Sequence, residues 1–194
     1  EGLGVDGRNR IFIAGQADGM IGPWATVNGT APALYSAARG VYAGSGTENG
    51  VAALGGTEAS VIRDNADASA VINQAGVSGP ITLEAPWTNR VLEVRQEWAS
   101  DAAIVALANG ITNKTLQASR IMVQAGKAAL TIGEAENSGY LTALSPGGVL
   151  SLENQNPSEL LTVKAAITNS GAACGLSKFG AGTGTMFAAA TPCR

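Results

Sequence analysis

Few side chains in this sequence are suited to catalysis. The chain contains no His, so neither a Ser-His-Asp triad nor a Cys-His pair can form. Paired carboxylates remain, since two acids can cleave polysaccharides, and among the five Asp only Asp64 and Asp67 lie close in sequence. An i,i+3 pair on a strand points to opposite faces, and Asn65 and Ser69 favour an Asx-type turn instead. We therefore predict that the protein is not an enzyme.

Metal ligands are equally sparse. The same Asp pair could bind calcium, but the nonapeptide calcium repeat with its regular Gly and Asp is absent. Two thiols without any His make a poor zinc site. The remaining acidic pairs, Glu134 with Glu136 and Glu84 with Glu93, are expected to be solvated. The sequence predicts neither a metal nor any other cofactor.

Both cysteines, Cys174 and Cys193, lie near the C-terminus, and Cys193 is the penultimate residue. They are either two unrelated thiols or a disulfide that ties down the C-terminal end of the chain. A disulfide would close a loop of about 20 residues and stabilise the fold by roughly 3 kcal/mol in the chain-entropy model. We favour the disulfide, which implies an oxidising setting. The predicted location is therefore extracellular or at the cell surface, after removal of a signal peptide.

Three Trp residues could contact a ligand. Aromatic faces suit the apolar faces of sugars, so that Trp24, Trp87 and Trp98 could form a sugar-binding platform. Trp87 follows Pro86 in a turn-like stretch and is expected to be exposed. Trp87 and Trp98 are the candidate sugar contacts. The alternative is that all three Trp side chains fill the core or cap an end of the fold.

The elements that would position these residues are predicted by a repeat. Residues 129–132 (Ala-Leu-Thr-Ile) match residues 149–152 (Val-Leu-Ser-Leu) at an offset of 20, and residues 140–143 match residues 160–163 at the same offset. We call this alignment the short repeat. Alternating apolar and polar positions are typical of strands with one buried face, and a strand-turn-strand unit of about 20 residues is typical of solenoids. The predicted fold is all-β, a right-handed parallel β-helix (β-solenoid).

Composition agrees with a solenoid and excludes other classes. Gly accounts for 26 of 194 residues, aromatic residues for 5% and charged residues for 14%, and stacked coils tolerate small side chains. A net charge of −3 without a basic cluster argues against nucleic acid, since Arg63, Arg90, Arg95 and Arg120 are scattered. The best apolar stretch, residues 102–108, is too short for a transmembrane helix, which needs about 20 residues.

Two regions are predicted, a glycine-rich, less regular segment over residues 1–60 and the solenoid over 61–194. In the first segment the strand candidates are 11–14, 24–27 and 40–43. From residue 61 onward short strands recur every 8–12 residues, with a short helix capped by Ser100 as an alternative for 102–108. The expected strands are 61–62, 70–72, 81–84, 91–98, 103–107, 115–117, 121–124, 130–132, 140–144, 149–152 and 160–167. The expected inward side chains are Ile81, Leu83, Leu92, Val94, Leu130, Ile132, Leu150, Leu152, Leu161 and Val163.

A family resemblance appears near the C-terminus. Residues 161–171 (Leu-Thr-Val-Lys-Ala-Ala-Ile-Thr-Asn-Ser-Gly), followed by 175–183 (Gly-Leu-Ser-Lys-Phe-Gly-Ala-Gly-Thr), resemble the autotransporter-associated β-strand repeat. Residues 21–43 are similar to a stretch found in large bacterial surface proteins with such repeats. The sequence departs from the family at Gly184-Thr185-Met186, where the repeat usually continues. The resemblance implies a passenger-type surface protein built as a solenoid.

The glycine-rich part of this match has a physical interpretation of its own. Gly175, Gly180 and Gly182 would permit positive φ at the corners of a coil. Leu176 and Phe179 are expected to face inward, and Lys178 to face solvent. The Gly-x-Gly pattern does not predict a nucleotide site, because no helix follows it.

Two functions remain from different classes. The first is a non-enzymatic extracellular structural or adhesive protein that polymerises end to end, with Ile11, Phe12 and Ile13 as the candidate self-association strand. The alternative is a carbohydrate-binding or polysaccharide-processing β-helix. The predicted partners are accordingly other copies of the chain, or a glycan or surface ligand, without nucleic acid.

Overall fold

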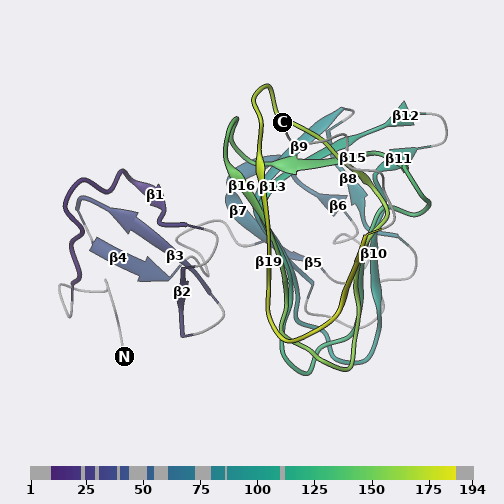
Figure 1. Ribbon diagram of the computed structural model, residues 1–194, viewed down its shortest axis with the longest axis horizontal. Coiled ribbons are helices and arrows are strands. Elements are labelled where there is room, and N and C mark those ends of the chain that lie inside the picture. The colour runs from purple at the N-terminus through teal and green to yellow at the C-terminus, as the bar shows by residue number, and fades with distance from the viewer. Residues whose placement is uncertain are drawn as a thin grey trace. The chain divides into compact units, whose positions relative to one another are not determined.

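The structure is a computed structural model (Figure 1) that describes residues 10–22, 25–28, 31–38, 40–43, 52–54, 61–72, 80–85, 87–109 and 112–186. These residues form strands, turns and loops without a helix, so the chain is all-β as predicted. No helix in these ranges therefore has the length and apolar character that a membrane span requires. The chain divides into two compact units, Glu1–Gly50 and Val51–Arg194.

The first unit contains a four-stranded antiparallel sheet. Its strands are β1 (Gly19–Met20), β2 (Thr26–Val27), β3 (Ala31–Ser36) and β4 (Gly40–Ala43). Strand β3 pairs with the other three, and a small core of Ala25, Ala33, Tyr35 and Val41 packs on it.

The predicted strand at residues 11–14 is wrong. Residues 10–13 are irregular and end in a turn at Ala14-Gly15, where Gly15 adopts a φ of 77°. One backbone contact attaches the segment to the sheet, since the Val41 N–H donates to the Ile11 carbonyl oxygen (2.8 Å). A turn directly after Ile13 leaves the segment too short to continue as a strand.

The second unit is a β-solenoid of stacked parallel strands. Its strands in chain order are β5 (Ala52–Leu54), β6 (Val61–Ile62), β7 (Asn65–Ile72), β8 (Thr82–Leu83), β9 (Thr88–Gln96), β10 (Ala103–Val105), β11 (Ala108–Asn109), β12 (Thr112–Asn113), β13 (Thr115–Val123), β14 (Leu130–Ile132), β15 (Tyr140–Ala143), β16 (Val149–Asn154), β17 (Leu161–Val163), β18 (Ala166–Ile167), β19 (Gly175–Phe179) and β20 (Gly184–Met186).

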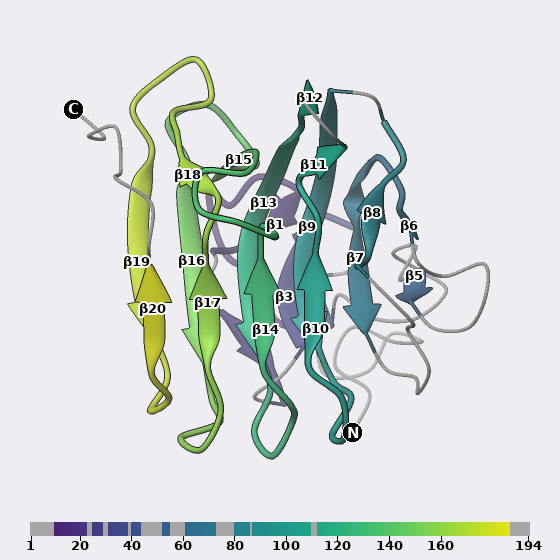
Figure 2. The same cartoon turned by 90° about the vertical axis from the view of Figure 1, so that its right-hand side faces the viewer.

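Two sheets form the walls of the solenoid. The first, which we call the long sheet, contains β5, β7, β9, β13, β15, β16, β18 and β19, and the second, the facing sheet, has the order β10-β14-β17-β20. Figure 2 shows the coils side by side from β5 and β6 at one end to β19 and β20 at the other. The short strands β6 and β8 pair with each other, and an isolated bridge joins Ile81 to Val105 of β10.

The solenoid begins earlier than the sequence indicated. Strand β5 pairs in parallel with β7, so that Ala52 lies opposite Ala70. The division between the two units falls after Gly50, whereas the predicted boundary followed residue 60. The strand Ala52-Ala53-Leu54 is short and composed mostly of small residues, so its sequence has no clear strand periodicity.

The short repeat does not give the stacking register. Thr88 lies opposite Thr115 and Ala103 opposite Leu130, an offset of 27. In the next coil Leu130 lies opposite Leu161, an offset of 31. The segments that the short repeat aligned, β14 and β16, lie in different sheets. The coils therefore vary in length, and the short repeat compared strands from opposite walls.

Several expected strands also divide differently. The two strands predicted at 115–117 and 121–124 are one continuous strand, β13, whose halves pair with β15 and β16. The single strand predicted at 160–167 is two strands, β17 and β18, which lie in different sheets. Residues 103–105 form strand β10, so the helix alternative for 102–108 is wrong.

The interior is filled by columns of apolar side chains. One column in the long sheet runs through Ala70, Val94, Ile121 and Leu152, which lie opposite one another on successive strands. All ten side chains predicted to face inward are buried, and nine of them belong to the central hydrophobic core.

Leu92 is the exception among the predicted inward residues. It is buried but lies outside the central core, which takes Val91 and Val94 from the same strand. The pairing of β9 with β13 omits Leu92 and its counterpart Ser119. The inward-facing positions therefore shift from odd-numbered residues (Val91) to even-numbered residues (Val94) at this point. Strict alternation along the strand does not predict such a shift.

Candidate functional site at the C-terminal end of the solenoid

The last coil presents two edge strands. Among the described residues, β19 pairs only with β16 and β20 pairs only with β17. An edge strand presents a row of backbone N–H and C=O groups that can pair with another chain. Both edges lie at the same end of the stack (Figure 2), so one partner could engage both sheets.

A lysine occupies the inward register position of this last coil. Lys178 lies opposite Leu152, and it therefore continues the column of Ala70, Val94, Ile121 and Leu152. Each of these earlier positions carries an aliphatic side chain.

The side-chain directions predicted for this strand are therefore only partly correct. Leu176 lies opposite the buried Leu150 and takes an inward position as expected. Phe179 does not, because it lies opposite Glu153 on the outer face. Lys178 is exposed to solvent as expected, but it is exposed at the open end of an inward column and not on the outer face.

The Lys178 ammonium is held by the turn that follows its strand. Its Nζ donates hydrogen bonds to the carbonyl oxygens of Gly180 (3.0 Å) and Gly182 (2.7 Å). The hydrocarbon stem can thus contact apolar neighbours while the charge reaches polar atoms, as is usual for Lys side chains beside an apolar surface.

Two glycines let this turn lie against the preceding coil. Gly180 adopts a φ of 85°, and a Cβ there would overlap the Asn154 carbonyl oxygen. A Cβ on Gly182 would overlap the Asn156 carbonyl oxygen. The predicted positive φ is thus confirmed at Gly180 and is wrong at Gly175 and Gly182. Gly182 is required by close backbone approach instead.

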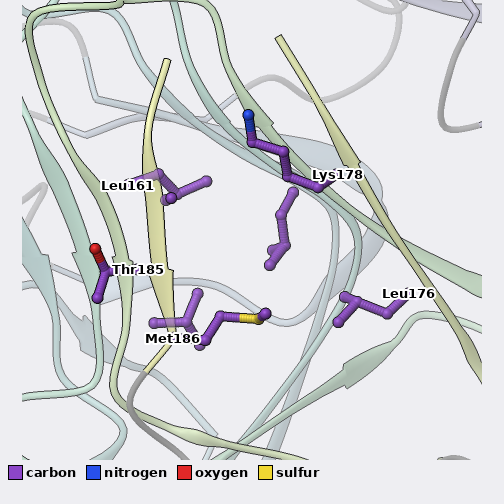
Figure 3. Close-up of a pocket in the computed structure, with 8 residues that line it drawn as sticks. Leu161, Leu176, Lys178, Thr185 and Met186 are labelled. Carbon is purple, nitrogen blue, oxygen red and sulfur yellow. The ribbon is translucent and has the colours of Figure 1, made fainter. Parts of the chain in front are cut away.

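An apolar pocket opens at this end, between the two sheets. It is lined by Leu152, Leu161, Val163, Leu176, Lys178, Gly184, Thr185 and Met186. Figure 3 shows Leu161, Leu176, Lys178 and Met186 around it, contributed by both walls of the solenoid. Leu176 is 40% exposed and Met186 is 55% exposed, although the residues opposite them in the preceding coil, Leu150 and Val163, are buried.

A second cluster, which the sequence did not predict, joins three strands of the long sheet. Glu93 accepts hydrogen bonds from Arg120 through Nε (2.8 Å) and Nη2 (2.6 Å), and from Arg95 through Nη1 (2.7 Å). Arg120 also contacts Glu153 (3.3 Å). The side chains of Glu93 and Arg120 are 0% and 1% exposed. We call Glu93, Arg95, Arg120 and Glu153 the ionic cluster.

The ionic cluster corrects two expectations. Glu93 is buried rather than solvated, and Arg95 and Arg120 lie together rather than scattered. Glu93 lies opposite Arg120 in the same register that pairs Thr88 with Thr115. An offset of 27 residues places Glu93 next to Arg120, whereas the offset of the short repeat does not.

Asp64 binds a neighbouring coil instead of forming an Asx turn. Its carboxylate accepts hydrogen bonds from the Arg90 backbone N–H (2.7 Å), Nε (3.1 Å) and Nη2 (2.8 Å). The hydrogen bond from the Arg90 side chain is the main cause that lowers the pKa of Asp64 below its ordinary value. The side chain of Asp67 lies outside the described residues.

The structure does not bring the Trp side chains together. Trp87 is exposed and immediately precedes β9. Trp98 follows the other end of β9, where its indole N–H donates to the Asp101 carboxylate (2.9 Å). The nine residues of this strand and Glu97 separate them, and the strand alone spans about 30 Å. Trp24 lies outside the described residues.

The other two candidate sites are partly described. Cys174 belongs to the core, and its thiol donates to the Thr168 carbonyl oxygen (3.4 Å). Cys193 lies outside the described residues, so the disulfide stays a prediction. Ile11, Phe12 and Ile13 are exposed, and their role in self-association also stays a prediction.

The fold of the second unit defines it as a β-solenoid. Within the described part of the chain, no group of three His, Cys, Asp or Glu side chains could hold a metal ion. No protein-family model matches the chain, and neither a curated protein nor a solved structure matches it. The resemblance to the autotransporter-associated repeat stays a prediction.

Proposed function

We propose that the protein is a non-enzymatic structural or adhesive protein of the cell surface, and that copies of it associate end to end through the C-terminal end of the solenoid. The observation that carries this proposal is the exposure of Leu176 and Met186 on two edge strands at one end. Exposed apolar side chains beside unpaired strand edges favour association with another chain.

A second copy is the occupant that fits this end best. A single added strand could pair with β19 or with β20, but not with both walls. At the opposite end of the solenoid, β5 ends the long sheet and β6 belongs to the short β6-β8 pair beside the facing sheet, and among the described residues each pairs with one neighbour only. Head-to-tail contact of this kind gives an open filament when the rotation does not close.

The test compares substitutions at the end with one on the side of the same solenoid. Leu176→Glu and Met186→Glu place a charge on the end, whereas Leu160→Glu places one at a similarly exposed position (46%) outside the pocket. We expect the intact chain and Leu160→Glu to form oligomers in sedimentation velocity and fibres in electron micrographs. The two end variants should remain monomeric. A strictly monomeric intact chain at high concentration would contradict the proposal.

The extracellular location is part of the same proposal, and it depends on the predicted Cys174–Cys193 disulfide. Mass spectrometry of protein from its native source, under non-reducing conditions, should show the loss of two hydrogens. Two free thiols would remove the argument for an oxidising location and leave the proposal on self-association untouched.

A further inference from the structure

We propose that Lys178 acts as a gate that weakens end-to-end association of the solenoid. This inference rests on the function proposed above, because it concerns the same end surface. Four successive coils place an aliphatic side chain in the column that Lys178 completes. An inward-pointing charge on an edge strand is one of the devices by which natural sheets avoid edge-to-edge pairing.

The cost of stacking follows from the position of the charge. Leu152 in the preceding coil is 5% exposed, which shows how completely a following coil covers this column. A second copy stacked on β19 would cover Lys178 in the same way. Removing an ammonium group from water is unfavourable unless polar atoms receive it.

Lys178 does not prevent stacking completely, because polar atoms of the protein already accept hydrogen bonds from its ammonium group. The carbonyl oxygens of Gly180 and Gly182 accept two of the three ammonium hydrogens. Stacking is therefore weakened rather than forbidden.

The remainder of the end surface favours stacking. Leu176 and Met186 line the pocket beside the lysine, and Figure 3 shows the Lys178 side chain at the rim of this apolar group. The balance between these side chains and one charge sets the concentration at which copies associate. Replacing Lys178 with an apolar residue of similar length should shift that balance strongly toward association.

The experiment measures self-association of three full-length chains by sedimentation velocity over a concentration series. They are the intact chain, Lys178→Met, and the matched control Lys164→Met. Lys164 Nζ contacts the Glu134 carbonyl oxygen (3.4 Å), and this residue lies outside the pocket. We expect Lys178→Met to associate at a concentration at least about tenfold lower than the intact chain, and Lys164→Met to behave like the intact chain.

Two further variants keep the test decisive. Lys178→Gln removes the charge while retaining a hydrogen-bond donor, and it should also strengthen association. It replaces Lys178→Met as the test if Lys178→Met fails to fold. Lys178→Met combined with Met186→Lys returns a charge to the same pocket and should reverse the effect.

The outcomes separate the gate from the proposed function. Equal association of the intact chain, Lys178→Met and Lys178→Gln would overturn the gate and leave end-to-end association standing. Association of the Lys178 variants alone, with an intact chain that stays monomeric, would support the gate and overturn assembly of the natural protein. If no variant associates at any concentration, both are overturned.

Discussion

The middle coils and the last coil of the solenoid follow the same path but differ in what they place inside it. In the middle coils the interior column is aliphatic, as at Val94, Ile121 and Leu152, and each strand is covered on both sides by its neighbours. In the last coil the same column continues with Lys178, and Leu176 and Met186 remain partly exposed. The difference shows that one fold can present a closed apolar interior and, one coil later, a mixed apolar and charged surface.

Charges that join coils also differ between regions of the solenoid. In the ionic cluster of the middle coils, Arg120 and Glu93 are buried. The pair Arg90–Asp64 also joins two coils, but its side chains are 54% and 31% exposed. A buried charge that loses its partner is strongly destabilising, whereas exposed pairs contribute little. The comparison between buried and exposed positions can therefore be tested by substitution.

The largest expected effect comes from placing a charge in the interior column. Leu152→Asp buries an unpaired carboxylate between coils and should cost at least about 4 kcal/mol of unfolding free energy, from lost packing and desolvation. Leu176→Asp, in the last coil, should cost far less because the new carboxylate reaches solvent. Urea unfolding followed by circular dichroism measures both. Equal losses for the two variants would show that the last coil is not an open end.

A smaller loss is expected when the ionic cluster is broken. Arg120→Met removes two hydrogen bonds to Glu93 and leaves a buried carboxylate with Arg95 alone among its partners in the cluster. The expected cost is about 3–5 kcal/mol. The matched control Arg90→Met removes an exposed arginine and should change stability little. If both variants unfold at the same urea concentration, the cluster is not the buried network described above.

The smallest effect concerns pH. Because the pKa of Asp64 is lowered in the folded protein, its pair with Arg90 stabilises the fold above the unfolded-state pKa of about 4. This contribution is lost as the pH falls through the lower, folded-state pKa. Asp64→Asn should therefore lower Tm slightly at pH 7 and not at pH 2. A difference that grows as the pH falls would contradict the assigned pair.

The fold class and most of the core could be predicted because they depend on local patterns. Alternation along residues 130–132 and 161–163 identifies buried strands without any knowledge of their partners. Local alternation does not predict the position of Leu92, because the inward-facing positions shift by one residue within its strand. It does not predict the position of Phe179 either, because Phe179 lies opposite the outward-facing Glu153.

The candidate site could not be predicted because it depends on the stacking register. The segments 130–132 (Leu-Thr-Ile) and 161–163 (Leu-Thr-Val) match at the true offset of 31 at least as well as the segments of the short repeat. Coils of unequal length allow several alignments, and only three-dimensional packing distinguishes them. The inward position of Lys178 and the ionic cluster both follow from this register.

The most direct test of the account is therefore a crosslink that reports the register of the last coil. Ser151 and Ser177 lie opposite each other, with their hydroxyl oxygens 3.1 Å apart, and neighbouring strands are spaced suitably for a disulfide. In the double variant Ser151→Cys/Ser177→Cys, peptide mapping should find these two cysteines joined. Thr131→Cys/Ser151→Cys, which the short repeat would bring together, should not crosslink. Crosslinking of the second pair instead of the first would contradict the register and the inward position of Lys178.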